Sequence, residues 1–248
     1  MQRNNAMSIE IKNLSFAYKN KQALDNVNLS LATGFNVLLG PNGAGKSTLF
    51  ALLTGLYQTK QSTININGFD LFLDKAKIMS QMGVVFQQST LDLDLSVKQN
   101  LLYFASLHGI SPKKALLNIE TILSQLSLTE RLNDPVRTLN GGHRRRVEIA
   151  RALIHQPKVL LLDEASVGLD MDSRLLIISY VRNLCQQLNI CVLWATHLMD
   201  EVEPDDQLIV LHQGKVQAQA LCNDLCEQYA SNDVYQLYFT LTKNTEAV

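Results

Sequence analysis

Nine consecutive residues near the start of the chain have the types and spacing that bind a polyphosphate. They fit the phosphate-binding loop pattern G-x-x-x-x-G-K-[ST], and they are Gly40, Pro41, Asn42, Gly43, Ala44, Gly45, Lys46, Ser47 and Thr48. Such a loop points successive backbone N–H groups at one anion, and a helix that begins after it adds partial positive charge. The pattern predicts that Lys46 reaches the β- and γ-phosphates and that Ser47 ligates Mg²⁺. A ligand-free glycine turn would match by chance in roughly one chain of this length in a hundred, so we predict a nucleotide site.

Two adjacent carboxylates, Asp163 and Glu164, follow an apolar run that ends at Leu162. The run predicts a fully buried strand, and open α/β sheets bind ligands at the carboxyl ends of their strands. Neighbouring carboxylates are costly there unless a cation accompanies them. Beside a phosphate loop we expect that cation to be Mg²⁺, with Asp163 in its ligand shell and Glu164 polarising water.

Three further residues each have a functional and a structural interpretation. Gln87 follows the apolar run Met82–Phe86, and His197 follows the run Ile190–Thr196. Both therefore stand at strand ends where ligands bind, although a simple loop opening and a structural histidine are the alternatives. Tyr18 ends an alternating run, where an aromatic residue is either an edge residue or a flat face for a nucleotide base.

A fourth candidate group is the start of an arginine-rich helical run, His143–Leu153. Asn140 precedes it and is a favoured helix N-cap, so capping and a solvated arginine face are the structural interpretation. Gly141 and Gly142 nevertheless leave bare N–H groups at a helix start, and these can hold an anion.

The composition is that of a globular protein with an ordinary core. Of the 248 residues 46% are hydrophobic, and 22 basic against 23 acidic residues give a formal charge of -1, so no overall field favours nucleic acid. The apolar runs are far shorter than the roughly 18 residues that span a bilayer, and the polar N-terminus is unlike a secretory signal, which predicts synthesis ending in the cytoplasm. We expect four free thiols, with Cys222 and Cys226 serving helix packing and not a metal.

The elements that must position these residues follow an α/β order. Alternation predicts two antiparallel strands, Ser8–Tyr18 and Val27–Leu31, and a strand at Phe35–Leu39 leads through the loop into a helix over Thr48–Tyr57. A strand ending in an Asn-Gly turn is expected over Ser62–Gly68.

The middle of the chain is expected to be a helical insertion. Its helices are predicted at Val97–Leu107, Lys113–Leu126 and His143–Ile154, and Ser111-Pro112 is a cap and first-turn pair for the second. Beyond it the pattern predicts a helix Arg174–Leu188 capped by Ser173, a hairpin turning at Gln213-Gly214, a helix near Asp224 and a short alternating run, Val234–Phe239.

Together these motifs resemble the ATP-binding subunit of ABC transporters, over nearly all of the chain from Ile9 to about Val216. Gly40–Thr48 is similar to the family's phosphate loop, Lys158–Ala165 to its second nucleotide motif, and Leu139–His143 to its signature. The resemblance implies an α/β fold, a P-loop NTPase (RecA-like) core with an N-terminal antiparallel β subdomain and an inserted α-helical subdomain. We accordingly assign an ABC ATPase domain to 7–220 (core 7–95 and 157–220, helical subdomain 96–156) and a C-terminal extension to 221–248.

The resemblance also implies roles for the open candidates in binding and hydrolysing ATP. Tyr18 stands where the family stacks adenine, and His197 at its switch histidine. Gln87 stands at the coupling glutamine and would complete the Mg²⁺ ligand set with Ser47 and Asp163. Glu164 would activate the attacking water.

The family's mechanism further implies partners. Two subunits close on two ATP molecules, so Asn140, Gly141 and Gly142 of one would contact the nucleotide of the other, with Asp170 in the inter-subunit loop. We expect the second subunit to be another copy of this chain. A separate transmembrane permease is expected to dock near Gln87 and residues 89–95, which places the protein on the cytoplasmic face of the membrane, with no nucleic acid partner.

Three departures from the family pattern bear on this expectation. The family has Ser at position 140, where Asn140 is a larger donor; His143 replaces a usual Gln, and Ala165-Ser166 a usual Pro-Thr. We expect activity to be retained because the residues of the hydrolysis machinery are present, namely Lys46, Ser47, Asp163, Glu164 and His197.

Three functions remain to be compared. The segments Thr90–Val97 and Leu107–Gly109 resemble the ABC-2 type exporter branch, which favours an exporter subunit; NGGHRRRVEIARAL and ATHLMDEVEPDD also resemble ATPases encoded beside quinoprotein alcohol-oxidation systems. A soluble ABC ATPase, such as an assembly or repair factor, is the alternative, although no long coiled coil or tandem ATPase is visible. The third is a nucleotide-gated interaction module in which Asn140 has abolished hydrolysis.

Overall fold

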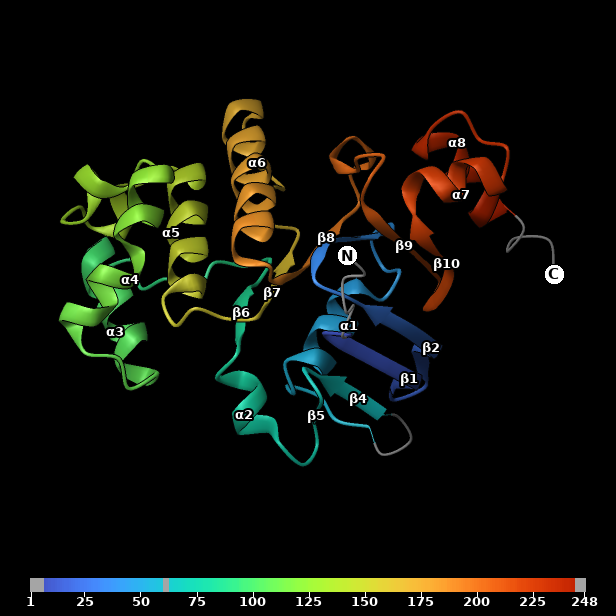
Figure 1. Ribbon diagram of the computed structural model, residues 1–248, viewed down its shortest axis with the longest axis horizontal. Helices are drawn as coiled ribbons and strands as arrows, with labels where there is room; N and C mark the ends of the chain where they lie inside the picture. The colour runs from blue at the N-terminus through green and yellow to red at the C-terminus, as the bar shows by residue number, and fades with distance from the viewer. Residues whose placement is uncertain (1–6, 60–62, 244–248) are drawn as a thin grey trace, which may run out of the picture. The chain divides into compact units, whose positions relative to one another are not determined.

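The computed structural model describes residues 7–59 and 63–243 (Figure 1). They divide into two compact units, one formed by the described residues before 80 and after 190 and the other by residues 80–190. We describe the first as the loop unit and the second as the helical unit. Each has its own strands and its own share of the candidate residues.

An antiparallel sheet begins the loop unit, in the order β2-β1-β4-β5. Its strands are β1 (Ile9–Tyr18), β2 (Lys21–Leu31), β4 (Thr63–Ile66) and β5 (Phe69–Asp70). Alternation places Ile9 and Ile11 in the core, as expected for a half-buried sheet. The turn between β4 and β5 has Asn67 and Gly68 at φ 51° and 80°, which fits a two-residue hairpin. The predicted antiparallel subdomain is confirmed, although β2 begins at Lys21 and not at Val27, and Ser62, the predicted start of the third strand, lies outside the described residues.

The second set of strands in the loop unit carries the phosphate loop. Its order is β10-β9-β3-β8, formed by β3 (Gly34–Leu39), β8 (Cys191–Thr196), β9 (Gln207–His212) and β10 (Lys215–Leu221). β3 runs parallel to both β8 and β9, and β10 returns antiparallel to β9. Helix α1 (Lys46–Leu53) follows β3, α2 (Lys75–Met79) follows β5, and a short 3₁₀ turn, η3 (Met199–Glu201), follows β8.

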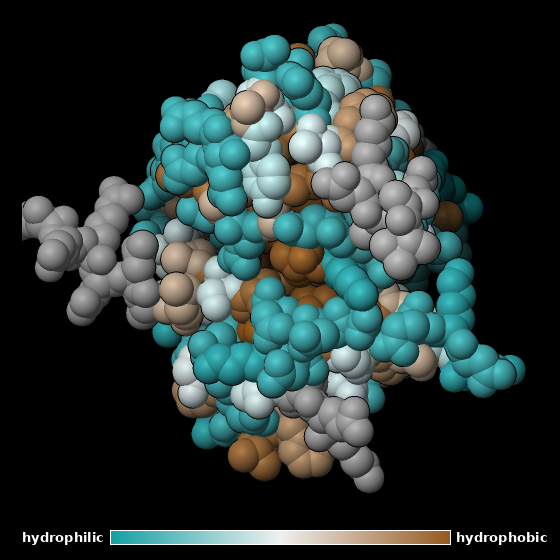
Figure 2. Space-filling view, turned by 90° about the vertical axis from the view of Figure 1, so that its right-hand side faces the viewer, coloured by the Kyte–Doolittle hydropathy of each residue, from teal (hydrophilic) through white to brown (hydrophobic). Residues whose placement is uncertain are grey.

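The C-terminal segment packs on this unit. It forms α7 (Cys222–Gln228) and α8 (Val234–Lys243), so the alternating run at 234–239 is helical. Leu237 and Leu241 are four residues apart, which is the spacing of one face of a helix. Both are buried in one apolar cluster with Val37 of β3 and Leu208 of β9. Figure 2 shows the side of the molecule where α8 lies in Figure 1, with hydrophobic residues showing at the centre and hydrophilic residues around them.

The helical unit holds a parallel strand pair and four helices. The strands are β6 (Met82–Val85) and β7 (Val159–Asp163), and the helices are α3 (Val97–Leu107), α4 (Pro112–Gln125), α5 (Gly141–Leu153) and α6 (Met171–Leu188), with 3₁₀ turns η1 (Thr129–Arg131) and η2 (Val136–Thr138). Ser111 caps α4 ahead of Pro112, and Asn140 caps α5, both as expected. α3, α4 and α5 lie together in Figure 1, which confirms a run of helices in the middle of the chain.

One predicted helix start is wrong. Ser173 does not cap α6, because the helix begins at Met171 and its N-cap is Asp170, whose carboxylate accepts a hydrogen bond from the Ser173 backbone N–H at 2.9 Å. Aspartate and serine are both favoured caps, and the pattern alone did not decide between them. Asp170 is therefore a capping residue at an exposed helix N-terminus.

The four cysteines are free, as predicted, and three of them are buried. Within residues 7–59 and 63–243 no group of three or more His, Cys, Asp or Glu side chains that could hold a metal ion is found. Each helix in the described ranges is too short or too polar to span a bilayer. The domain boundaries at 95, 156 and 220 stay a prediction.

Candidate nucleotide site

The phosphate loop leads into α1, and no side chain caps the start of that helix. Its N-cap, Gly45, has φ 109° and no side chain, so no side-chain cap satisfies the first N–H groups of the helix. Those groups are the ones that bind an anion. The Lys46 ammonium, buried to 4% exposure, donates to the carbonyl oxygens of Gly40 at 2.7 Å and Pro41 at 3.2 Å. The lysine thus lies along the loop, while Ser47 beside it is exposed.

Two other segments of the loop unit contact the phosphate loop, namely the turn between β9 and β10 and strand β2. The Gly214 N–H, in the turn between β9 and β10, donates to the Ala44 carbonyl at 2.9 Å, and a Cβ on Gly45 would lie 2.7 Å from the Ala23 carbonyl oxygen of β2. A Cβ on Gly214 would meet the same oxygen at 2.7 Å. The sequence predicted the hairpin turn at Gln213-Gly214, but nothing in it showed that the turn holds the phosphate loop.

Tyr18 lies beside the loop helix, as its position at the end of β1 allows. Its hydroxyl is 3.3 Å from Thr48 Oγ1, and its ring meets Phe16 and Tyr57 edge-on at centroid distances of 5.1 and 5.5 Å. The ring remains 42% exposed. Phe16 and Tyr57 were not singled out from the sequence, because Tyr57, which follows α1, meets the two β1 residues only in the folded chain.

His197 follows the strand that adjoins the loop strand. The Thr196 carbonyl accepts from the Gly40 N–H at 3.1 Å, so the residue before His197 is bonded to the first glycine of the phosphate loop. The turn after His197 is tied back to β8, because Trp194 Nε1 donates to Glu201 Oε2 at 2.9 Å, with both side chains buried. The sequence did not indicate this tryptophan–glutamate bond.

The helical unit brings three of its candidates together. Asp163 ends β7 and Glu164 follows it, with 4% and 5% exposure, and Gln87 Nε2 donates to Glu164 Oε2 at 3.1 Å. Glu164 has φ 49°, an uncommon value for a residue with a side chain. Residues held in such conformations cluster at functional sites, which is consistent with a role for Glu164 in chemistry.

A buried ion pair fixes the backbone of Gln87. Arg145 donates to the carbonyl oxygens of Phe86 at 2.7 Å and Gln87 at 2.9 Å, and it pairs with Glu148 at 2.7 Å. The solvated-face interpretation is thus wrong for Arg145, which is 9% exposed. An arginine that turns inward has the same helical spacing as one that faces water.

The starts of α5 and α6 adjoin each other. Asn140 accepts the His143 N–H at 2.8 Å, and a Cβ on Gly142 would lie only 2.5 Å from Ser173 Oγ. Hydrogen bonds from Ser173 lower the pKa of Asp170, so its carboxylate is charged at neutral pH. The signature residues and Asp170 therefore form one cluster within the helical unit.

A strand, a glycine loop and a helix whose first N–H groups lack a side-chain cap, with an acidic pair at another strand end, define a phosphate-loop nucleotide-binding protein. The ABC transporter family model matches residues 24–167, and the chain belongs to this family. The match spans the phosphate loop, Gln87, the signature and the acidic pair.

Three similar proteins and one similar solved structure are also ATP-binding proteins by name. The linearmycin resistance ATP-binding protein LnrL of Bacillus subtilis (strain 168) is 32% identical over 92% of this chain and 74% of its own. The ABC transporter ATP-binding protein NatA of the same organism is 31% identical over 88% and 90%, and the Nod factor export ATP-binding protein I of Sinorhizobium fredii (strain NBRC 101917 / NGR234) 34% over 94% and 68%. The structure of an ATP binding subunit of an ABC transporter has a TM-score of 0.84 and 26% identity, covering 94% of this chain and 99% of that one. The chain is an ATP-binding subunit of an ABC transporter, an ATPase with the cassette fold, which confirms the resemblance, the fold class and the enzyme class.

Proposed function

We propose that two copies of this chain hydrolyse ATP at the cytoplasmic face of a membrane to drive export through a separate permease. The observation that carries the hydrolysis step is the bond from Gln87 to the buried carboxylate of Glu164. This contact between a buried carboxylate and a polar side chain, in the same unit as Asp163, supports the assignment of Glu164 as the general base. Support for export comes from relatives named for antibiotic resistance and for Nod factor export, although sulfate and thiosulfate import proteins are also similar.

In this proposal each side chain has a distinct task in phosphoryl transfer. Lys46 and the N–H groups of the loop hold the phosphates, Glu164 accepts a proton from the attacking water, and His197 holds that water with the terminal phosphate. Ser47, Gln87 and Asp163 would supply the hydroxyl, amide and carboxylate oxygens that Mg²⁺ prefers. The ion would neutralise charge on the phosphate oxygens. Tyr18 would stack on adenine with its exposed face.

The two-copy arrangement is supported by what the starts of α5 and α6 leave exposed. Three residues at these helix N-termini are exposed, namely Asn140, Gly141 and Asp170. Residues that serve a nucleotide in a second copy must be accessible in the single chain. A monomer should therefore hydrolyse ATP slowly.

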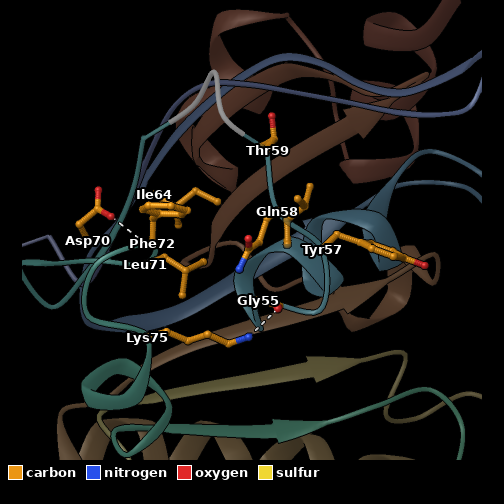
Figure 3. Close-up of a pocket in the computed structure, with 10 residues that line it drawn as sticks. Gly55, Tyr57, Gln58, Thr59, Ile64, Asp70, Leu71, Phe72 and Lys75 are labelled. Carbon is orange, nitrogen blue, oxygen red and sulfur yellow. Dashed lines mark hydrogen bonds between the residues drawn. The ribbon is translucent and has the colours of Figure 1, made fainter.

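Besides the segment at Gln87 and residues 89–95, where we expect a permease to dock, the loop unit exposes two adjacent apolar side chains that could contact one. Phe72 and Leu73 are 74% and 78% exposed, and Phe72 lines a hollow of about 40 Å³ that also has Gly55, after α1, and Lys75, at the start of α2, in its wall. Figure 3 shows Lys75 reaching across this hollow, where its ammonium donates to the Gly55 carbonyl at 2.7 Å. Because the link fixes α2 against the phosphate-loop helix, we propose that a permease segment seated here senses the nucleotide.

A pull-down from gently solubilised membranes tests the permease partner. The tagged chain carrying Glu164→Gln should recover one multi-span polypeptide, and more of it with ATP than without. The matched chain with Phe72→Ser and Leu73→Ser should recover less while still binding ATP. Recovery of soluble partners alone would contradict the transporter proposal and favour the soluble ABC ATPase.

A further inference from the structure

The asparagine that begins the signature helix has one oxygen that accepts two hydrogen bonds. The backbone N–H of His143 donates to Asn140 Oδ1 at 2.8 Å, and Nδ1 of the same histidine lies 2.8 Å from that oxygen. A backbone N–H finds an acceptor only at the oxygen of an amide side chain. The first bond therefore settles which end of the Asn140 amide faces the helix, and the second must be compatible with it.

The second bond settles where the proton of His143 resides. Because a carbonyl oxygen only accepts, Nδ1 must be the nitrogen that carries hydrogen. Burial lowers the pKa of His143, Arg146 and Arg131 lower it further, and Asp134 opposes them. The imidazole is therefore neutral at pH 7, with its hydrogen on Nδ1 and an unprotonated Nε2.

The amide nitrogen of Asn140 is left for a ligand. Asn140 is exposed, and among the residues that the structure describes its Nδ2 has no hydrogen-bond partner. Two N–H hydrogens are thus offered beside the start of a 13-residue helix. An asparagine without the histidine bond could still cap α5, but its side chain would be held by one hydrogen bond where it now has two.

We propose that His143 is a positioning residue, whose Nδ1–H holds the Asn140 amide so that its NH₂ group donates to the terminal phosphate of ATP bound by a second copy. This rests on the two-copy function proposed above. A serine hydroxyl at position 140 can rotate its hydrogen toward a phosphate without help. With Asn140, the hydrogen-bond donor is the NH₂ group of a larger side chain, and His143 holds that side chain in place. The two residues must therefore act together.

A double-mutant cycle in chains that also carry Glu164→Gln tests the coupling. The quantity measured is the Mg-ATP concentration that gives half-maximal dimer, by light scattering. His143→Ala should raise it about fivefold or more when Asn140 is present, and less than about twofold alongside Asn140→Ser, as contacting residues couple. His143→Gln should recover part of the loss, because its amide can donate to the same oxygen. Equal effects of His143→Ala in both backgrounds would overturn the proposal.

The matched control is Arg144→Ala. Arg144 is the next residue of the same helix and donates to the carbonyl oxygens of Val136 and Arg137. Its loss should lower the melting temperature without shifting the ATP midpoint. A shift as large as that of His143→Ala would mean that any damage to α5 suffices, and would overturn the positioning role.

The tautomer is read separately by NMR of the ATP-free chain. The ring ¹⁵N shifts of His143 should show hydrogen on Nδ1, and hydrogen on Nε2 would overturn the proposal whatever the dimer does. If the Nδ1 tautomer is found and no dimer forms at saturating Mg-ATP, the geometry stands. The two-copy function then fails, and the role of His143 fails with it.

Discussion

Gln87 Nε2 donates to Glu164 Oε2 at 3.1 Å, which ties the polar residue after β6 to the carboxylate after β7. Both strands end at the same edge because they run parallel, and Arg145 holds the Gln87 carbonyl from behind. Any change at Gln87 is therefore transmitted to the base that we assign to water activation.

Gln87→Ala should lower kcat about tenfold or more, because a mispositioned general base costs part of its 10²- to 10⁴-fold contribution, and it should leave ATP binding in the absence of Mg²⁺ nearly unchanged. Phosphate release and equilibrium binding of a fluorescent ATP analogue measure the two quantities. The neighbouring Gln88, also exposed, supplies the control Gln88→Ala, which should match the wild type. Equal losses in both variants would contradict a specific Gln87–Glu164 interaction.

Gly214→Ala should weaken ATP binding. Gly214 has φ 77° and a Cβ there would lie 2.7 Å from the Ala23 carbonyl oxygen, so the turn must move and the Ala44 carbonyl loses its N–H donor. Gly68→Ala is the control, since Gly68 has φ 80° with nothing within 4 Å of the added Cβ.

Both alanines should lower the free energy of unfolding by about 1 to 2 kcal/mol through left-handed strain. Only Gly214→Ala should raise the Kd for ATP, measured by titration calorimetry. An unchanged Kd would show that the hairpin turn does not hold the phosphate loop.

Trp194→Phe should affect hydrolysis through the turn after His197. The substitution removes the only donor that the indole gives to buried Glu201, at a cost of about 1 to 3 kcal/mol in unfolding free energy. Because Glu201 ties the turn to β8, kcat should fall more than ATP affinity. Trp194 is the single tryptophan of the chain, so its fluorescence should also change when ATP binds to the wild type.

Tyr180→Phe is the matched control for that prediction. The Tyr180 hydroxyl is buried without a hydrogen-bond partner among the described residues, so its removal should leave both stability and kcat unchanged or slightly improved. A kcat loss in Tyr180→Phe equal to that in Trp194→Phe would attribute the effect to general loosening.

The stacked pair His155 and His108, with ring centroids 4.0 Å apart, predicts a pH dependence of stability. Burial, with His108 adding to it, lowers the pKa of His155 to about 4, although its bond to the Met82 carbonyl opposes this. The unfolded chain, with a histidine pKa near 6.5, therefore binds more protons than the folded one between about pH 4 and pH 6.5. The free energy of unfolding should rise with pH across that window. This added stability should be lost when the pH falls back through the window.

Urea unfolding between pH 4.5 and 7 measures this. His155→Phe keeps an aromatic ring against His108 and Phe104 and should flatten the dependence. Two charged groups are linked to this cluster: Arg151, which lies over the Phe104 ring, and Glu148, which interacts with Arg151. An unaltered pH slope in His155→Phe would assign the effect to other groups.

Much of this molecule follows from its sequence because its motifs coincide with strand and helix ends. The β3, loop and α1 segment, the acidic pair after β7 and the Asn140 cap all depend on local patterns. Where two residues satisfy the same local rule, the sequence does not choose, as with Asp170 and Ser173 at the start of α6.

What the sequence could not show depends on contacts between distant segments. The inward turn of Arg145 toward Phe86 and the support of Ala44 by Gly214 join residues 59 and 170 positions apart. The run at 234–239 likewise alternates with a period of two in the sequence, yet it forms part of helix α8, which is buried against β3. Such pairings are decided by packing.

The central claim is that this chain turns over ATP with Glu164 as its base, and phosphate release at a series of protein concentrations tests it most directly. We expect the wild type to hydrolyse Mg-ATP, with a rate per chain that rises with protein concentration, and Glu164→Gln to bind ATP and release almost no phosphate. A wild type that binds ATP and releases none at any concentration would contradict it, and would make the chain a nucleotide-gated module in which Asn140 has abolished hydrolysis.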